Sequence, residues 1–93
     1  MNNNKPTVEI REWYVDDYMW TLYGHVFGHY NFEDNNFVRT SSIFGVSKES
    51  DRFIVETRNT NYICLFSENK NYGNPSIDEV YKMLQKAVDN YEA

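Results

Sequence analysis

The chain has 93 residues, which is enough for one domain with a modest hydrophobic core. Asp and Glu outnumber Lys and Arg by 14 to 9, giving a net charge of −5, and the basic residues form no run. Because duplex nucleic acid is bound through a basic face, this composition argues against a DNA- or RNA-coating protein. We find no signal peptide and no apolar stretch of membrane-spanning length, so we expect no membrane partner.

The first part of the chain predicts a tail followed by a strand. Residues 1–6 are polar and Asn-rich, which favours a flexible tail, and residues 7–93 are expected to form a single domain. Apolar and polar residues alternate over residues 7–14 and predict a strand. The acidic pair Asp16 and Asp17 then predicts a turn.

The next part predicts two more strands around a loop. Residues 18–27 are expected to form the second strand, in which Gly24 marks either a bulge or a close approach of another backbone. Residues 28–36 are polar and predict a loop. Residues 37–46 are expected to form the third strand.

A hairpin is predicted after a turn at residues 48–51. Its strands are residues 52–58 and 61–66, and Asn59 and Thr60 make the tight connection, because Asn tolerates a left-handed backbone. Residues 67–75 are expected to form a polar loop.

The C-terminal residues 76–92 predict an amphipathic helix. Ser76 and Glu79 form a capping box, and Pro75 suits a helix start. The apolar residues recur at helical spacing: Ile77, Val80, Tyr81, Leu84, Ala87, Val88 and Tyr91. The predicted fold class is therefore α+β, a small curved antiparallel sheet or partly open barrel of about five strands in residues 7–66, with the helix packed on it.

The single cysteine, Cys64, lies in the apolar stretch of residues 62–66. It cannot form an intramolecular disulfide, and a lone thiol is typical of a reducing compartment, so we expect a cytoplasmic protein. The surrounding residues place Cys64 in the core rather than in a catalytic site.

Two short polar segments are the most site-like feature of the sequence. Residues 39–42 and 57–60 each set one arginine, Arg39 or Arg58, among hydroxyl and amide side chains. An arginine fork matches phosphate or carboxylate, and Ser, Thr and Asn add neutral donors to the same anion. If the fold brings the segments together, they form an anion-binding patch. The alternative is that each arginine pairs with a surface acid such as Glu56 or Glu9.

Nearby aromatic residues extend this hypothesis to a nucleotide. The chain is 17% aromatic, which suits either an aromatic core or rings on a binding surface. Trp20, Tyr23 or Tyr62 would stack on a base while the arginines hold phosphate. The same aromatic content in so short a chain leads us to expect a homo-oligomer.

No residue pattern predicts catalysis or a metal site. His25 and His29 lie four residues apart, but in a strand and loop this spacing does not bring them to one ion, and no Cys or carboxylate cluster completes a site. No phosphate-cradling glycine motif or nucleophile elbow occurs. We therefore expect no enzyme activity, no cofactor and no metal.

From about Trp20 to Phe66, roughly half of the chain, the sequence resembles small proteins encoded by bacterial viruses. The resemblance rests on residues 23–29, 38–43 and 55–62 and on the Asn- and Tyr-rich composition. It implies a non-enzymatic accessory role in the host cytosol, often the inhibition of a host defence. The C-terminal helix has no counterpart in this resemblance.

Three functions are consistent with the sequence. The first is an anti-defence protein that binds and sequesters a small phosphorylated immune signal, such as a cyclic or ADP-ribose-type nucleotide. The second is an acidic inhibitor that binds a host defence protein directly, such as a CRISPR effector. The third is a virion structural or assembly protein. For the first, the predicted ligand-binding residues are Arg39, Ser41, Thr57, Arg58, Asn59, Thr60, Trp20 and Tyr62.

Overall fold

The computed structural model describes residues 5–16 and 18–91. The predictions for residues 1–4, Asp17 and Glu92 lie outside this part of the chain. The elements in chain order are β1 (Thr7–Asp16), β2 (Thr21–Phe27), β3 (Asn36–Arg39), β4 (Ile43–Lys48), β5 (Arg52–Thr57), β6 (Asn61–Leu65), the 3-10 helix η1 (Phe66–Glu68) and α1 (Ile77–Asp89).

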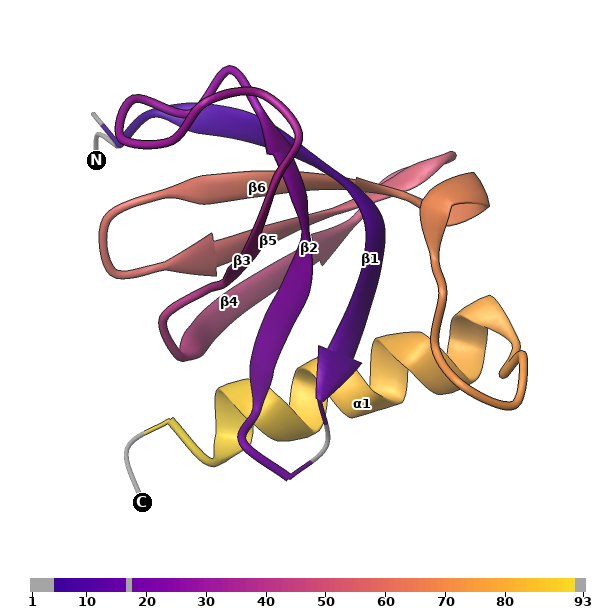
Figure 1. Cartoon of the computed structure of the whole chain (residues 1–93). Helices are drawn as coiled ribbons and strands as arrows, with labels where there is room; N and C mark the ends of the chain where they lie inside the picture. Colours follow the sequence, from indigo (N-terminus) through magenta and orange to yellow (C-terminus); the bar gives the residue numbers. More distant parts are fainter. Residues whose placement is uncertain (1–4, 17, 92–93) are drawn as a thin grey trace.

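The strands form one curved six-stranded sheet with the order β3-β2-β1-β6-β5-β4, and α1 packs against it (Figure 1). The α+β class is therefore confirmed. The sheet is mixed rather than antiparallel, because β1 and β6 pair in parallel and join two antiparallel three-stranded units. β3 and β4 remain as its edges, so the sheet does not close into a barrel.

A bulge in β1 bends the sheet. The register between β1 and β2 shifts between Arg11 and Tyr14, where Glu12 has a φ of 51°. Gly24 lies opposite, and a Cβ there would stand 2.7 Å from Ile10 Cγ1 and 3.0 Å from the Arg11 carbonyl oxygen. Of the two predictions for Gly24, the close backbone approach is the one observed, since the bulge itself lies in β1.

The third predicted strand, residues 37–46, is wrong as a single element. It divides into β3 and β4, which lie at opposite edges of the sheet. The linker of residues 40–42 crosses the end of β2, where the Thr40 N–H donates to the Leu22 carbonyl (2.9 Å) and the Leu22 N–H donates to the Thr40 hydroxyl (3.0 Å). These two bonds end the pairing of β3 with β2. The predicted third strand therefore becomes two strands, and the sheet has six strands rather than about five.

The second strand starts later than expected, at Thr21. Tyr18 and Met19 belong to a turn in which the Asp16 carboxylate accepts the Tyr18 N–H (2.8 Å) and the Asp16 carbonyl accepts the Trp20 N–H (2.8 Å). Asp16 therefore ends β1 with its own side chain, as Asp commonly does in turns.

The predicted helix and its capping box are confirmed, although α1 ends at Asp89 rather than near residue 92. The Glu79 N–H donates to the Ser76 hydroxyl (3.1 Å), and the Ser76 N–H donates to the Glu79 carboxylate (2.8 Å). Together they satisfy backbone donors that a helix start leaves free. The buried face of α1 consists of Val80, Leu84 and Ala87.

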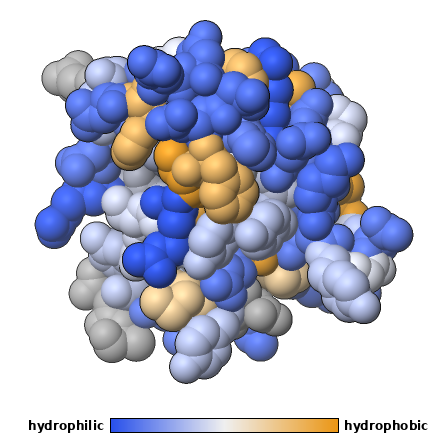
Figure 2. All heavy atoms as spheres, viewed as in Figure 1, coloured by the Kyte–Doolittle hydropathy of each residue, from blue (hydrophilic) through white to orange (hydrophobic). Residues whose placement is uncertain are grey.

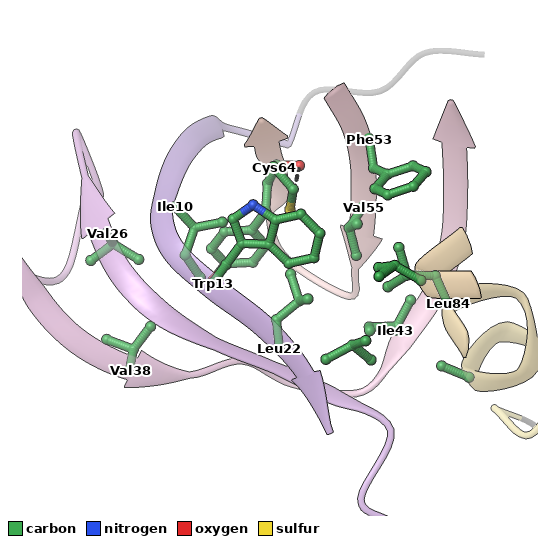
Figure 3. Close-up of a cluster of buried hydrophobic side chains, with 14 of the residues drawn as sticks. Ile10, Trp13, Leu22, Val26, Val38, Ile43, Phe53, Val55, Cys64 and Leu84 are labelled. Carbon is green, nitrogen blue, oxygen red and sulfur yellow. Dashed lines mark hydrogen bonds between the residues drawn. The ribbon is translucent and has the colours of Figure 1, made fainter. Parts of the chain in front are cut away.

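The core lies between the concave face of the sheet and α1 (Figure 3). Trp13, Phe53 and Leu84 are fully buried, and the Trp13 indole N–H donates to the Leu65 carbonyl (2.8 Å). Cys64 is buried among them, as predicted, and burial raises the pKa of its thiol well above the ordinary value. Among the residues described here, no helix is both long and apolar enough to cross a bilayer.

Candidate functional site

An open hollow of about 220 Å³ lies where three connecting segments meet. It is lined by residues 29–32 of the β2–β3 loop, by residues 38–41 at the end of β3, and by the β5–β6 turn with Tyr62 of β6. In Figure 1 the β2–β3 loop is at the top and the other two segments are at the left. The face in this view is mostly hydrophilic, with a small apolar group near its centre (Figure 2).

The fold brings the two predicted polar segments together at this hollow. Residues 39–41 and 57–60 are far apart in the sequence, but the β3–β4 linker and the β5–β6 turn both reach its rim. The predicted site residues that line the hollow are Arg39, Ser41, Thr57, Asn59, Thr60 and Tyr62.

Arg58 and Trp20 do not line the hollow. Arg58 is exposed at the β5–β6 turn. Trp20 lies in the turn before β2, where its carbonyl accepts the Ile43 N–H (3.4 Å) and its ring packs against the core.

Among the polar side chains that the β3–β4 and β5–β6 segments present to the hollow, Arg39, Ser41 and Asn59 have unused donors. All three are exposed, and none forms a side-chain hydrogen bond or ion pair within residues 5–16 and 18–91. The alternative, that Arg39 and Arg58 pair with an acid such as Glu56 or Glu9, is not observed among the described residues, and the Glu9 carboxylate binds Arg11 (2.8 Å). These three side chains can therefore bind an anion from solvent.

Thr57 and Thr60 have structural roles in the β5–β6 turn. The Thr57 hydroxyl and backbone N–H both donate to the Thr60 carbonyl, at 3.0 Å and 2.9 Å. The Thr60 hydroxyl is hydrogen-bonded to the Tyr30 hydroxyl (2.9 Å). Both threonines are almost fully buried, so they hold the turn and the β2–β3 loop in place around the hollow.

An aromatic wall, which we define as His29, Tyr30 and Phe32, also lines the hollow and was not predicted from the sequence. The His29 ring stacks on Tyr30 at a centroid distance of 4.4 Å and meets Phe32 edge-on at 4.9 Å. Tyr30 is 54% exposed and Phe32 44% exposed. Of the residues predicted to stack, Tyr62 reaches the hollow but is only 5% exposed, and burial raises its pKa.

Backbone hydrogen bonds hold the aromatic wall in a defined loop. The Asp34 carboxylate accepts the Gly28 N–H (2.8 Å), and the Asn35 N–H donates to the Val26 carbonyl (2.7 Å). Gly28 has a φ of 78°, which favours glycine. The one sequence signal for this wall was three ring-bearing residues in a polar loop, one of which, Phe32, is of a type that is usually buried.

His29 is held as a neutral ring with a defined tautomer. Its Nδ1 accepts the Asn31 N–H (2.9 Å), so the proton of the neutral ring lies on Nε2. Burial lowers the His29 pKa because it disfavours the charged form. His25 lies elsewhere, with Nδ1 2.9 Å from the Asn35 carbonyl and Nε2 3.7 Å from the Glu12 carboxylate.

A second group of rings lies on the convex face of the sheet. Tyr14, Tyr23 and Phe37 form a stacked row with centroid distances of 5.1 Å and 6.1 Å, and His25 meets Phe37 edge-on at 5.2 Å. We call these four residues the outer aromatic row. Phe37 is 55% exposed, and the row faces away from the core, on the side of the sheet where Tyr23 lies opposite Arg39 of β3.

No protein-family model matches this chain, and neither the curated proteins nor the solved structures contain a significant match to it. The function is therefore argued from the geometry of the site.

Proposed function

We propose that this protein binds and sequesters a small phosphorylated ligand, such as a nucleotide, in the hollow lined by Arg39. The observation that carries the proposal is the convergence of Arg39, Ser41 and Asn59 from two distant segments, each with donors that no described residue uses. The resemblance to small viral proteins makes a nucleotide signal of a host defence the first class of ligand to test.

The charge at the hollow supports an anionic ligand. The chain has a net charge of −5, yet no carboxylate is among the described residues that line the hollow, and Arg39 is the cation there. A planar guanidinium can donate two parallel hydrogen bonds to a phosphate, and the Ser41 hydroxyl and Asn59 amide can donate to its other oxygens.

The lining also supports binding rather than conversion. Hydrogen-bond donors and ring faces are the groups that hold a nucleotide without sequence readout. The threonines of the β5–β6 turn are already hydrogen-bonded to the protein, so they act by positioning Asn59 and the loop above it.

The proposal is tested by thermal denaturation with a panel of cyclic dinucleotides, cyclic mononucleotides and ADP-ribose derivatives. A ligand that binds the folded state raises the melting temperature. We expect Arg39→Gln to abolish the shift, because it removes the charge-assisted contact, while Arg58→Gln is the matched control and keeps it. If no compound shifts the melt, or both variants behave alike, the proposed site is wrong.

The outer aromatic row favours a second candidate function, direct binding of a host protein. The row exposes Phe37, and the Glu12 carboxylate lies 3.7 Å from His25 of the row, so this surface suits a partner with a basic face. We expect Phe37→Ala to weaken such a complex and leave nucleotide binding unchanged. A known defence protein that binds equally well to Phe37→Ala would contradict this candidate.

A further inference from the structure

We infer that the ligand carries a single nucleobase-like ring, which stacks on the aromatic wall of His29, Tyr30 and Phe32 while its phosphate is bound by Arg39. This inference rests on the proposed function and specifies its ligand as a nucleotide with one base in the hollow.

The aromatic wall offers ring surface where a ligand can reach it. Tyr30 and Phe32 are large rings that are 54% and 44% exposed and line the hollow rather than the core. Their contacts with His29, at 4.4 Å and 4.9 Å, hold the three rings in one group. An exposed, preorganised ring surface is what a planar base requires for stacking.

His29 contributes to this surface as a neutral ring. Its Nδ1 is occupied by the Asn31 N–H (2.9 Å), which leaves Nε2–H as its remaining donor. Tyr30 is fixed through its hydroxyl to Thr60 (2.9 Å), so the wall is tied to the turn that presents Asn59. A hydrogen bond therefore links the stacking surface to the turn that carries Asn59.

The wall and the anion donors belong to different sides of the hollow. The wall comes from the β2–β3 loop at the top of Figure 1, whereas Ser41 and Asn59 come from the linker and turn at the left. A ligand with a ring at one end and a phosphate at the other fits this division. Inorganic phosphate or a sugar phosphate would use only the donor side.

The size of the hollow suits one base. Its volume of about 220 Å³ is below the roughly 300–1,000 Å³ of pockets that enclose drug-sized ligands. One base and its phosphate can enter while the rest of the molecule remains in solvent. A nucleotide with two bases would leave one of them outside.

The test compares adenosine 5′-monophosphate with ribose 5-phosphate by isothermal titration calorimetry on the unmodified protein. The two probes share the phosphate and the sugar and differ in the base. We expect adenosine 5′-monophosphate to bind about tenfold or more tightly, which is the scale of one base–aromatic stack. Equal affinities would overturn the inference and leave the proposed function standing. Failure of both probes to bind would overturn the inference, and the thermal-denaturation panel then decides the proposed function.

A pair of phenylalanine variants locates the base. Phe32→Leu should reduce the affinity for adenosine 5′-monophosphate towards that of ribose 5-phosphate, with little effect on ribose 5-phosphate itself. Phe37→Leu is the matched control, because Phe37 is similarly exposed but belongs to the outer aromatic row. If Phe37→Leu removes the preference and Phe32→Leu does not, the base is bound on the convex face and the inference is wrong.

Discussion

His29 connects the chemistry of one ring to the conformation of a loop. Its Nδ1 accepts the Asn31 N–H, and a protonated ring would place an N–H donor against that donor. Burial and this hydrogen bond both favour the neutral form, which agrees with the lowered His29 pKa. The aromatic wall therefore depends on the protonation state of His29.

We expect His29 to titrate below its ordinary pKa of 6.5, as measured by NMR of its ring protons. The unfolded chain therefore binds this proton more tightly than the folded protein does. The stability that His29 contributes is fully present above about pH 6.5, and it is lost as the pH falls from there towards the pKa of the folded protein. His29→Asn keeps an acceptor for Asn31 and does not titrate. Its stability should fall less than that of the unmodified protein between about pH 7 and pH 5, and an equal fall would contradict this role.

Two glycines in the sheet should differ in their tolerance of a side chain. A Cβ at Gly24 would stand 3.0 Å from the backbone oxygen of Arg11, whereas a Cβ at Gly45 would meet the end of the flexible Glu56 side chain at 2.7 Å. We expect Gly24→Ala to cost about 1–3 kcal/mol in chemical denaturation. Gly45→Ala should cost less than about 1 kcal/mol. Similar costs would mean that the bulge does not bring β1 and β2 so close.

At the scale of elements, α1 supplies part of the core through one face. Leu84 is fully buried, so Leu84→Ala should lower the free energy of unfolding by about 2–5 kcal/mol. The exposed neighbour Gln85 is the control, and Gln85→Ala should change it by no more than about 0.5 kcal/mol. A neutral Leu84→Ala would contradict the packing of α1 on the sheet.

Ser76→Ala should lower the free energy of unfolding by about 1 kcal/mol, because it removes the side-chain cap of α1.

The sequence predicted the elements that depend on neighbouring residues. The capping box of α1 and the β5–β6 turn each involve residues within a few positions of one another. The parallel pairing of β1 with β6 joins strands more than 50 residues apart and has no local signal. The crossing at residues 40–42 also depends on a distant partner, Leu22, and so a continuous strand was expected there.

At the scale of the whole molecule, the candidate site exists because the curved sheet brings three connections to one place. The polar part of the site was predictable from the two polar segments, residues 39–42 and 57–60. Only the fold determines that Arg39 lines the hollow and Arg58 does not. The aromatic part of the site was not predictable, because the spacing of His29, Tyr30 and Phe32 does not reveal which way a loop folds. Association into a homo-oligomer stays a prediction.

The most direct test of the central claim is a two-dimensional ¹H–¹⁵N NMR titration of the protein with adenosine 5′-monophosphate. We expect the amide signals that move to belong to the residues that line the hollow, namely residues 29–32 and 38–41, Thr57, Asn59 and Thr60. Arg39→Gln should abolish these changes, and Arg58→Gln should preserve them. Signals that stay unchanged, or that move around Tyr14, Tyr23 and Phe37 on the convex face instead, would contradict the claim that the hollow is the binding site.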